Sequence, residues 1–188
     1  MKIKCFDAAE LPIEEWQDKC GNSAEVFCWP VASDFSLRVS ITQINQSSVL
    51  KQHAESEQFC ISLDNGQLSI RDQQKTKHSM AKIGDAFHSE GEQLIELELR
   101  GSPVRLLNVS VNPERWRVKS HVIAQEQRLP IGQAGIVYVL AGEWDVSGAN
   151  CKIMAVNQGG WWLPDIGEGH ITPRVAGSKL IWVDITAC

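Results

Sequence analysis

An internal repeat with an offset of 76 residues, the spacing from Gly66 to Gly142, most constrains how this chain can fold. At that offset four pairs of glycines coincide without a gap. The apolar patterns also agree, since "CISLDNGQLSI" lies over "IVYVLAGEWDV" and "RGSPVRLLNVS" lies over "AGSKLIWVDIT". Self-similarity at a fixed spacing indicates a duplicated structural unit. The coincident pairs are Gly66/Gly142, Gly84/Gly160, Gly91/Gly167 and Gly101/Gly177. We expect the first, second and fourth of these pairs at equivalent turns.

The repeated unit has the pattern of β-strands. In "LRVSIT", Leu37, Val39 and Ile41 alternate with polar residues, and "FCISLDN" and "LIELELR" alternate in the same way. Such alternation is typical of antiparallel strands with one face in the core. The glycines between these runs have the spacing of turns. Because helical pattern is nearly absent, we predict an all-β chain of two tandem sandwiches or jelly-roll barrels.

The segment "GGWWLPDIGEGH" at residues 159–170 resembles the second sequence motif of cupin barrels, in which Gly, Pro and His recur at short intervals. Together with the repeat, this resemblance implies tandem cupin-like barrels, a bicupin, with little helix. The length suits a single bicupin-like domain over 1–188. We expect the first cupin-like repeat at about residues 28–112 and the second at about 113–188.

The metal ligands of a cupin are incomplete in both repeats. A cupin site combines two His and a Glu of the first motif with one His of the second, in an open pocket suited to Fe, Mn, Ni or Zn. Counting back from Gly66 places His53 and Glu55 at the two His positions, but Phe59 at the Glu position. His170 fills the second-motif position of the other repeat. Because that repeat lacks first-motif ligands, we predict no metal and no cofactor, and interpret His170 as a rim residue. The first-motif positions there are Leu129, Ile131 and Gly135.

Charge and composition exclude several classes of function. The net charge of −5 does not favour nucleic acid or an anionic membrane as a partner. No apolar run approaches the roughly 18 residues of a membrane helix, and the N-terminal stretch has no apolar signal region. The nucleophile-elbow, P-loop and dinucleotide motifs are absent, so the sequence gives no positive sign of catalysis. The six cysteines are scattered without a C-x-x-C pair, which favours reduced thiols in a cytoplasmic protein.

Four segments of the chain resemble the HutD/Ves family, bicupin-like proteins of histidine utilisation or environmental stress. The segments are "WQDKCGNSAEV", "WPVASDFSLRVSIT", "LDNGQLSI" and "GSPVRLLNVSV". The family's first motif resembles W-K-N-G-G-G-T-T-x-E, of which Trp16, Gly21, Ser23 and Glu25 are retained in kind. Residues 17–20 depart from it. The resemblance implies a cytoplasmic regulatory or accessory protein that binds a small anionic metabolite, such as formylglutamate or urocanate.

The candidate ligand-binding residues follow from this resemblance and from strand geometry. Arg38 and Ser40 project from one strand face, about 7 Å apart, and an Arg fork beside a hydroxyl suits a carboxylate. The alternative is that Arg38 is a solvated strand residue or the ion-pair partner of a Glu on a neighbouring strand. The candidate site comprises Trp16, Glu25, Arg38, Ser40, His53 and Asn108.

Three functions stay open at this point. The first is a non-enzymatic protein that binds an anionic metabolite. The second is a cupin enzyme, an isomerase or dioxygenase with an atypical or absent metal site. The third is a protein-interaction module that uses tryptophans. Trp161 and Trp162 must face opposite ways if they lie in a strand, so one of them leaves the core. Pairing of sheet edges makes a homodimer a further expectation.

Overall fold

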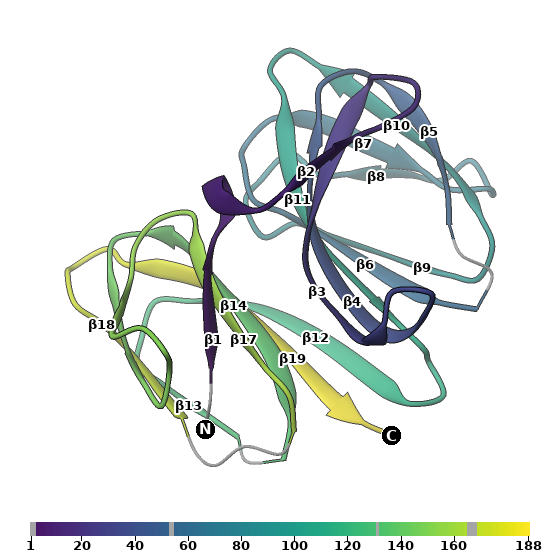
Figure 1. The fold of residues 1–188 in the computed structure, drawn as a ribbon. Helices are drawn as coiled ribbons and strands as arrows, with labels where there is room; N and C mark the ends of the chain where they lie inside the picture. The colour runs from purple at the N-terminus through teal and green to yellow at the C-terminus, as the bar shows by residue number, and fades with distance from the viewer. Residues whose placement is uncertain (1–2, 53–54, 131, 165–168) are drawn as a thin grey trace. The chain divides into compact units, whose positions relative to one another are not determined.

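The computed structural model describes residues 3–52, 55–130, 132–164 and 169–188 (Figure 1). Within these ranges the regular structure is strand, apart from the single turn of 3-10 helix η1 (Ala8–Glu10). The prediction of an all-β chain with little helix is therefore confirmed. None of the described helical residues forms a span long and apolar enough to cross a membrane.

The chain divides into two compact units, which we name by the repeat that each contains. The first-repeat unit is Pro12–Trp116, and the second-repeat unit joins Met1–Leu11 to Arg117–Cys188. The strands of the first-repeat unit are β2 (Ile13–Glu15), β3 (Gly21–Val31), β4 (Asp34–Ile44), β5 (Ser48–Lys51), β6 (Glu57–Ser62), β7 (Gln67–Arg71), β8 (Lys77–Ser79), β9 (Ala86–Glu90), β10 (Leu94–Arg100) and β11 (Val104–Val111).

Two antiparallel sheets make up the first-repeat unit. One has the order β2-β3-β4-β11-β6-β9 and the other β5-β10-β7-β8. Apolar side chains of both sheets meet in one core, to which the alternating strands contribute as the sequence pattern predicts. The buried members of this core are Ile44, Cys60, Leu68, Ile70, Met80, Phe87, Ile95, Leu97, Val104 and Leu106.

The second-repeat unit also has two sheets, with the orders β1-β17-β14-β19-β12 and β13-β18-β15-β16. Three tryptophans, Trp144, Trp162 and Trp182, lie in its core. Trp161 and Trp162 do point apart, since Trp162 is buried whereas the Trp161 ring lies under the ammonium group of Lys4. The strands are β1 (Lys4–Asp7), β12 (Trp116–Ile123), β13 (Gln127–Leu129), β14 (Ala134–Ala141), β15 (Trp144–Ser147), β16 (Ile153–Met154), β17 (Gln158–Trp162), β18 (Gly169–Pro173) and β19 (Lys179–Ala187).

Eight strands of each unit correspond in order, whereas β2 and β3 of the first-repeat unit and β1 of the second have no counterpart. The run β12-β19-β14-β17 takes the places of β4-β11-β6-β9, and β13-β18-β15-β16 takes those of β5-β10-β7-β8. Gly101 and Gly177 precede the equivalent strands β11 and β19, both at positive φ (87° and 81°). The expectation for Gly84 and Gly160 is wrong, because Gly84 is in a turn whereas Gly160 lies inside β17. Gly167 lies outside the described residues.

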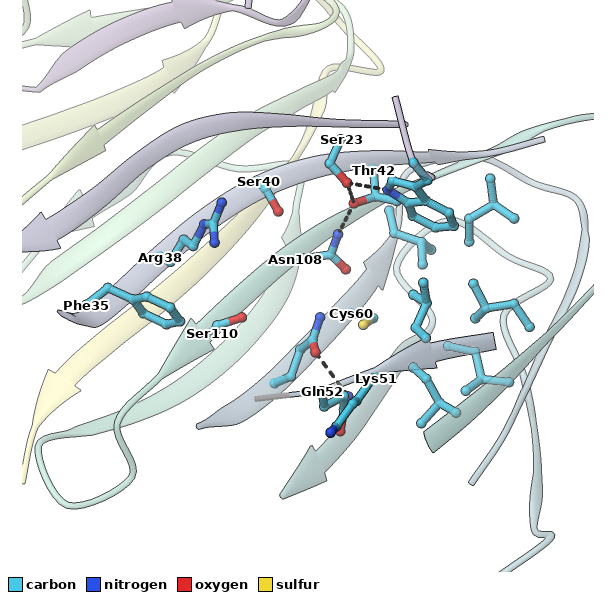
Figure 2. Close-up of a pocket in the computed structure, with 18 residues that line it drawn as sticks. Ser23, Phe35, Arg38, Ser40, Thr42, Lys51, Gln52, Cys60, Asn108 and Ser110 are labelled. Carbon is cyan, nitrogen blue, oxygen red and sulfur yellow. Dashed lines mark hydrogen bonds between the residues drawn. The ribbon is translucent and has the colours of Figure 1, made fainter. Parts of the chain in front are cut away.

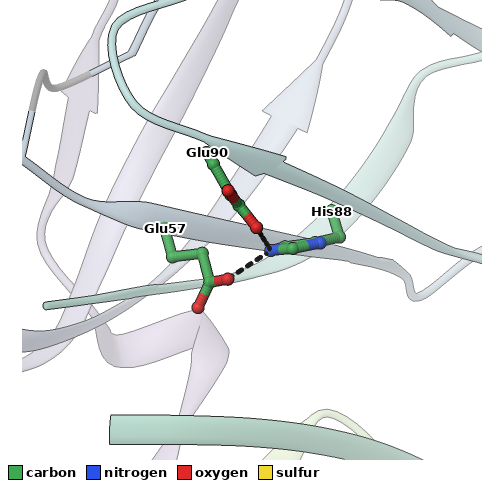
Figure 3. Close-up of side chains that lie close together, drawn as sticks. All are labelled: Glu57, His88 and Glu90. Atoms are coloured by element: carbon green, nitrogen blue, oxygen red, sulfur yellow. Dashed lines mark hydrogen bonds and ion pairs between the residues drawn. The ribbon is translucent and has the colours of Figure 1, made fainter. Parts of the chain in front are cut away.

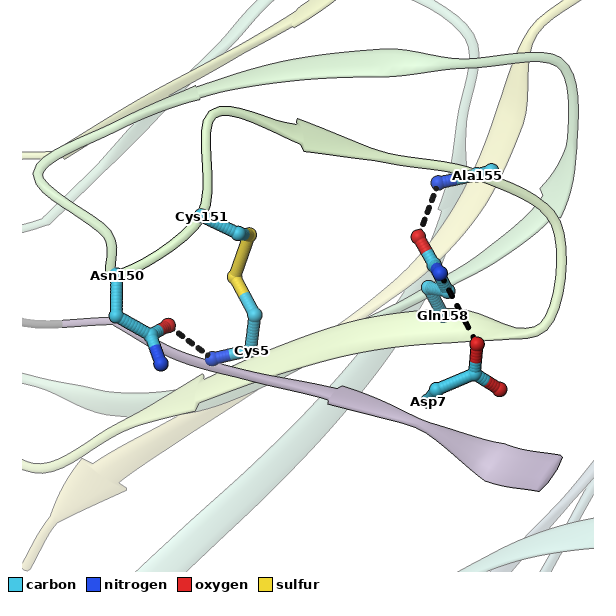
Figure 4. The surroundings of a disulfide bond; sticks show 6 residues. All are labelled: Cys5, Asp7, Asn150, Cys151, Ala155 and Gln158. Atoms are coloured by element: carbon cyan, nitrogen blue, oxygen red, sulfur yellow. Dashed lines mark hydrogen bonds between the residues drawn. A yellow bond between two sulfur atoms is a disulfide. The ribbon is translucent and has the colours of Figure 1, made fainter. Parts of the chain in front are cut away.

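A disulfide joins the N-terminal strand β1 to the rest of the second-repeat unit. Strand β1 pairs with β17, and Cys5 is bonded to Cys151 with their Cα atoms 6.1 Å apart (Figure 4). The backbone NH of Cys5 also donates to Asn150 Oδ1 at 2.7 Å. The expectation that all the cysteines are reduced is wrong for this pair. The pairing of β1 with β17 brings together two cysteines 146 residues apart. No local sequence pattern predicts this disulfide.

Candidate functional site

A cavity of about 220 Å³, lined by both polar and apolar side chains, lies in the first-repeat unit (Figure 2). Its floor is formed by three neighbouring strands, β4, β11 and β6. The register places Ser40 opposite Asn108, and Asn108 opposite Cys60. The next row contains Arg38 and Ser110. Because side chains alternate across a strand, all five project from the same face of the sheet, and all five line the cavity.

A chain of hydrogen bonds holds one end of the cavity. Trp16 Nε1 donates to Ser23 Oγ at 3.0 Å, and this oxygen is 3.0 Å from Thr42 Oγ1. The Asn108 amide nitrogen donates to the same Thr42 oxygen at 2.6 Å, with its carbonyl oxygen turned toward the cavity (Figure 2). Gly21 lets Trp16 pack here, since an added Cβ would lie 3.0 Å from the indole ring and 2.5 Å from a backbone oxygen. The Asn108 carbonyl is thus a fixed acceptor.

Arg38 lies at the exposed side of the cavity and forms an ion pair. Its Nε is 2.9 Å from Glu25 Oε2, and the side chain is 36% exposed. The guanidinium also lies 5.7 Å from the centre of the Phe35 ring. The ion pair with a Glu of the neighbouring strand is the alternative that the sequence left open. The described pair engages Nε only, and a guanidinium carries two further nitrogens that can bind a carboxylate in parallel.

A buried glutamine closes the wall opposite Arg38. Gln52 is 5% exposed, and its Nε2 donates to Gln58 Oε1 at 3.0 Å and to Ser89 Oγ. Its backbone NH donates to the Gln93 carbonyl at 2.9 Å. Among the described residues, no group donates to Gln52 Oε1, although this oxygen is buried. A buried carbonyl without a partner is uncommon, because it has lost its hydrogen bonds to water.

The structure places four of the six candidate ligand-binding residues in the cavity lining. Trp16, Arg38, Ser40 and Asn108 line the cavity. Glu25 is exposed and contacts Arg38, and His53 lies outside the described residues. Whether these residues bind a ligand stays a prediction.

Sequence reasoning missed the glutamines of the cavity wall. A signal for Gln58 was present, since Gln58, Cys60 and Ser62 alternate with the apolar residues of "FCISLDN". The alternation by itself predicts that only the apolar face is buried. The structure buries both faces of this strand, and Gln58 and Cys60 line the cavity.

The HutD family model matches residues 8–178 of the chain. The chain belongs to the HutD family. It is 27% identical to the Ves protein of Cronobacter sakazakii over 188 residues, which cover 98% of this chain and 99% of that protein. Its fold is similar to that of HutD from Pseudomonas fluorescens SBW25, with a TM-score of 0.83 at 17% identity over 99% of each chain. A cupin barrel protein from Leptotrichia buccalis has a similar fold, with a TM-score of 0.62 at 12% identity over 98% of this chain and 96% of that one.

Two of the cupin-type candidate ligands of this HutD-family protein, Glu55 and His170, belong to different units. His170 lies on β18, where its Nε2 is 2.9 Å from Glu126, in the second-repeat unit. Glu55 is exposed in the first-repeat unit. The ligand atoms of Glu57, His88 and Glu90 lie within 4.8 Å of one another (Figure 3). These three side chains project from the face of β6 and β9 opposite to the cavity, because they alternate with its lining residues.

The cavity contains a thiol, but not a reactive one. Cys60 is fully buried, and burial raises the pKa of its thiol to about 12. The thiolate is the nucleophilic form of cysteine. At neutral pH the Cys60 thiol is therefore protonated, and it serves as a small apolar part of the cavity wall.

Proposed function

We propose that this HutD-family protein is a non-enzymatic accessory or regulatory protein that binds a small anionic metabolite in the first-repeat unit. The observation that carries the proposal is the half-open cavity, lined by apolar and uncharged polar side chains, with Arg38 at its exposed side. Its volume of about 220 Å³ lies below the roughly 300–1,000 Å³ of pockets for drug-sized ligands. A metabolite of a few carbon atoms suits this space.

The arrangement of donors favours a carboxylate. The two outer nitrogens of Arg38 form a planar fork, and Ser40 and Ser110 offer hydroxyls on the same sheet face. Charge-assisted hydrogen bonds of this kind are shorter and about twice as strong as neutral ones. Lys51, at another part of the lining, adds a second positive charge and itself pairs with Glu92. An anion therefore meets two cations, and the apolar lining takes its carbon chain.

The lining supports binding rather than catalysis. The Cys60 thiol is protonated, and among the described lining residues there is no histidine or carboxylate to act as a general base. The proposal includes the tandem cupin-like arrangement of the two units, a cytoplasmic location, and a role in histidine utilisation or stress response. Family membership supports the accessory role.

Calorimetric titration of formylglutamate, urocanate and smaller carboxylates tests this function. Loss of the charge-assisted contact in Arg38→Ala removes about 1.5–3 kcal/mol of binding free energy, which weakens the affinity by one to two decades. The matched control is Arg71→Ala, since Arg71 is 41% exposed, pairs with Glu96 and lies outside this cavity. We expect the control to bind like the wild type.

The urea midpoint of Arg38→Ala separates binding from structure. The Arg38–Glu25 pair is more than one-third exposed, and such pairs contribute about 0–1 kcal/mol to stability. We therefore expect a nearly unchanged midpoint. If no carboxylate binds, or if Arg38→Ala binds normally, the proposed function is wrong.

A further inference from the structure

We infer that Glu57, His88 and Glu90 form a site for a divalent transition-metal ion of the Zn²⁺ type, on the face of β6 and β9 opposite the cavity (Figure 3). This site goes beyond the proposed function and does not depend on it. The prediction of no metal made from the sequence concerned the cupin ligands, and none of those positions belongs to this group.

The strand register brings the three ligands together. Glu57 stands directly opposite Glu90 in the pairing of β6 with β9, and His88 stands opposite Phe59. Because side chains alternate across a strand, these residues project from one face of the sheet. His88 Nε2 is 2.8 Å from Glu57 Oε1 and 4.0 Å from Glu90 Oε1, and the ligand atoms of the three residues all lie within 4.8 Å of one another.

The site contains two negative charges with little compensation. Like charges directly opposite each other on paired strands are unfavourable. Among the described residues, no lysine or arginine forms an ion pair with Glu57 or Glu90, and both pair with His88 alone. The side chain of Glu57 is only 13% exposed, so salt screens its charge less than that of an exposed group. A divalent cation would neutralise both carboxylates at once.

His88 is held in the orientation that a metal ligand needs. Its ring stacks on Phe59, with 4.5 Å between the ring centres and 16° between the planes. This contact orients the imidazole so that Nε2 points between the two carboxylates (Figure 3). Neutral imidazole is a common metal ligand through either nitrogen. The metal ion would replace the proton between Nε2 and Glu57 Oε1, and that proton passes to Nδ1 of the same ring.

The donor set favours a transition metal over Mg²⁺ or Ca²⁺. Those two ions take oxygen ligands, whereas an imidazole nitrogen with two carboxylate oxygens suits Zn²⁺ and its neighbours. Ligand atoms at about 2.1 Å from a tetrahedral Zn²⁺ are roughly 3.4 Å apart. The separations of 2.8 and 4.0 Å lie on both sides of this value. Because Glu90 is 74% exposed, its side chain is free to move the short remaining distance.

Calorimetric titration of the wild-type protein with Zn²⁺ tests the site. We expect one Zn²⁺ ion to bind per chain at these residues. Replacing a group that only orients a metal ligand weakens the affinity by about 10–100-fold, so loss of a ligand itself should weaken it by at least about ten-fold. We expect this loss in both Glu57→Gln and Glu90→Gln, which keep the size of the side chain. A wild-type protein that binds no Zn²⁺, or equal binding in all three proteins, would overturn the inference.

The matched control is Asp72→Asn. Asp72 Oδ2 is 3.1 Å from His78 Nε2, so this pair has the same histidine–carboxylate chemistry. Among the described residues, no further ligand completes it to a group of three. We expect the control to bind Zn²⁺ like the wild type. A loss of affinity equal to that of Glu57→Gln would show that Zn²⁺ binds exposed histidine–carboxylate pairs without selection, and the inference would be wrong.

Thermal unfolding separates ligand loss from damage to the fold. Strand β9 lies at the edge of its sheet, and an ion bound to all three residues ties β9 to β6. A ligand that binds only the folded state raises the melting temperature. We expect Zn²⁺ to raise the Tm of the wild type but not that of Glu90→Gln, while the two proteins have nearly the same Tm without Zn²⁺. An equal rise in both would contradict the site.

Competition with Mg²⁺ tests the class of the ion. Because the site includes a nitrogen ligand, we expect an excess of Mg²⁺ to leave Zn²⁺ bound. Displacement of Zn²⁺ by Mg²⁺ at comparable concentrations would overturn the role of His88 as a ligand. Arg38→Ala should bind Zn²⁺ like the wild type, so the failure of this site and the failure of the proposed function appear in separate titrations.

Discussion

The two units share the order of eight strands, but the strand row that lines the cavity in one unit has a tryptophan ring over a glycine in the other. In the first-repeat unit Asn108 stands opposite Cys60, and this row lines the cavity. In the second-repeat unit the equivalent strands place Asp184 opposite Gly135. The ring of Trp162 lies over that glycine, since an added Cβ would come within 2.3 Å of it. The strand order alone therefore does not decide whether the interior can bind a ligand.

The size of a few side chains makes the difference. By register, Trp162 takes the place of Phe87 and Trp182 that of Leu106. Trp162 is 1% exposed. Both indoles belong to the core of the second-repeat unit, and each is larger than the phenyl ring or isobutyl group at the equivalent position of the first. The same framework thus buries indole rings in one unit and surrounds a cavity in the other.

Trp162→Ala should produce the largest effect, because it removes a fully buried indole from the core of the second-repeat unit. Replacing a buried aromatic residue by alanine costs about 3–5 kcal/mol of stability. The measurement is the free energy of unfolding from urea denaturation. The control is Ser110→Ala, at the cavity of the other unit, for which we expect less than about 1 kcal/mol. Equal losses in both variants would contradict the contrast between a core indole of one unit and a cavity-lining hydroxyl of the other.

Opening the Cys5–Cys151 disulfide should have the next largest effect. The bond closes a loop with a sequence separation of 146, and loss of such a bond costs about 2–4 kcal/mol. We expect reducing agent and the double variant Cys5→Ser/Cys151→Ser to lower the urea midpoint to the same degree. Reducing agent should not affect the double variant further. An unchanged midpoint in the double variant would show that β1 is held by its pairing with β17 alone.

The redox state of this disulfide also bears on location. Disulfides persist in oxidising compartments and are rare in the cytosol. Alkylation of thiols at the moment of cell lysis, followed by mass spectrometry, shows whether Cys5 and Cys151 are bonded in the cell. The cytoplasmic location that we propose predicts that both thiols are alkylated, so that the folded protein there relies on β1–β17 pairing.

The sequence predicted the class of the fold because both the repeat and the period-two pattern can be read directly along the chain. Arg38 and Ser40 could be placed on one face by simple alternation, and the strand register then adds Asn108. The rest depends on contacts between distant segments. The unpaired carbonyl of Gln52 is set by Gln58 and Ser89, and the disulfide by the pairing of β1 with β17. Neither contact has a fixed spacing along the chain, so no motif could reveal it.

The smallest expected effect concerns Asp184, which takes the strand position in the second-repeat unit that Asn108 takes in the first. Asp184 is partly buried, and burial raises the pKa of its carboxyl group, an effect that His121 and Lys119 partly oppose. Among the described residues its Oδ1 has no hydrogen-bond partner. Because the folded-state pKa lies above the unfolded value, the folded protein holds the proton more tightly. Stability from this group is therefore present at low pH and is lost as the pH rises from the unfolded pKa through the folded one.

Asp184→Asn should remove this penalty by giving the second-repeat unit the neutral amide that Asn108 provides in the first. We expect a slightly higher urea midpoint than that of the wild type at pH 7, and a smaller difference near pH 3, where the carboxyl group is protonated in both states. The control is Asp145→Asn, an exposed carboxylate on β15 in the same unit. A variant less stable than the wild type at pH 7 would mean that the charge of Asp184 is stabilised by His121 and Lys119 more than burial disfavours it.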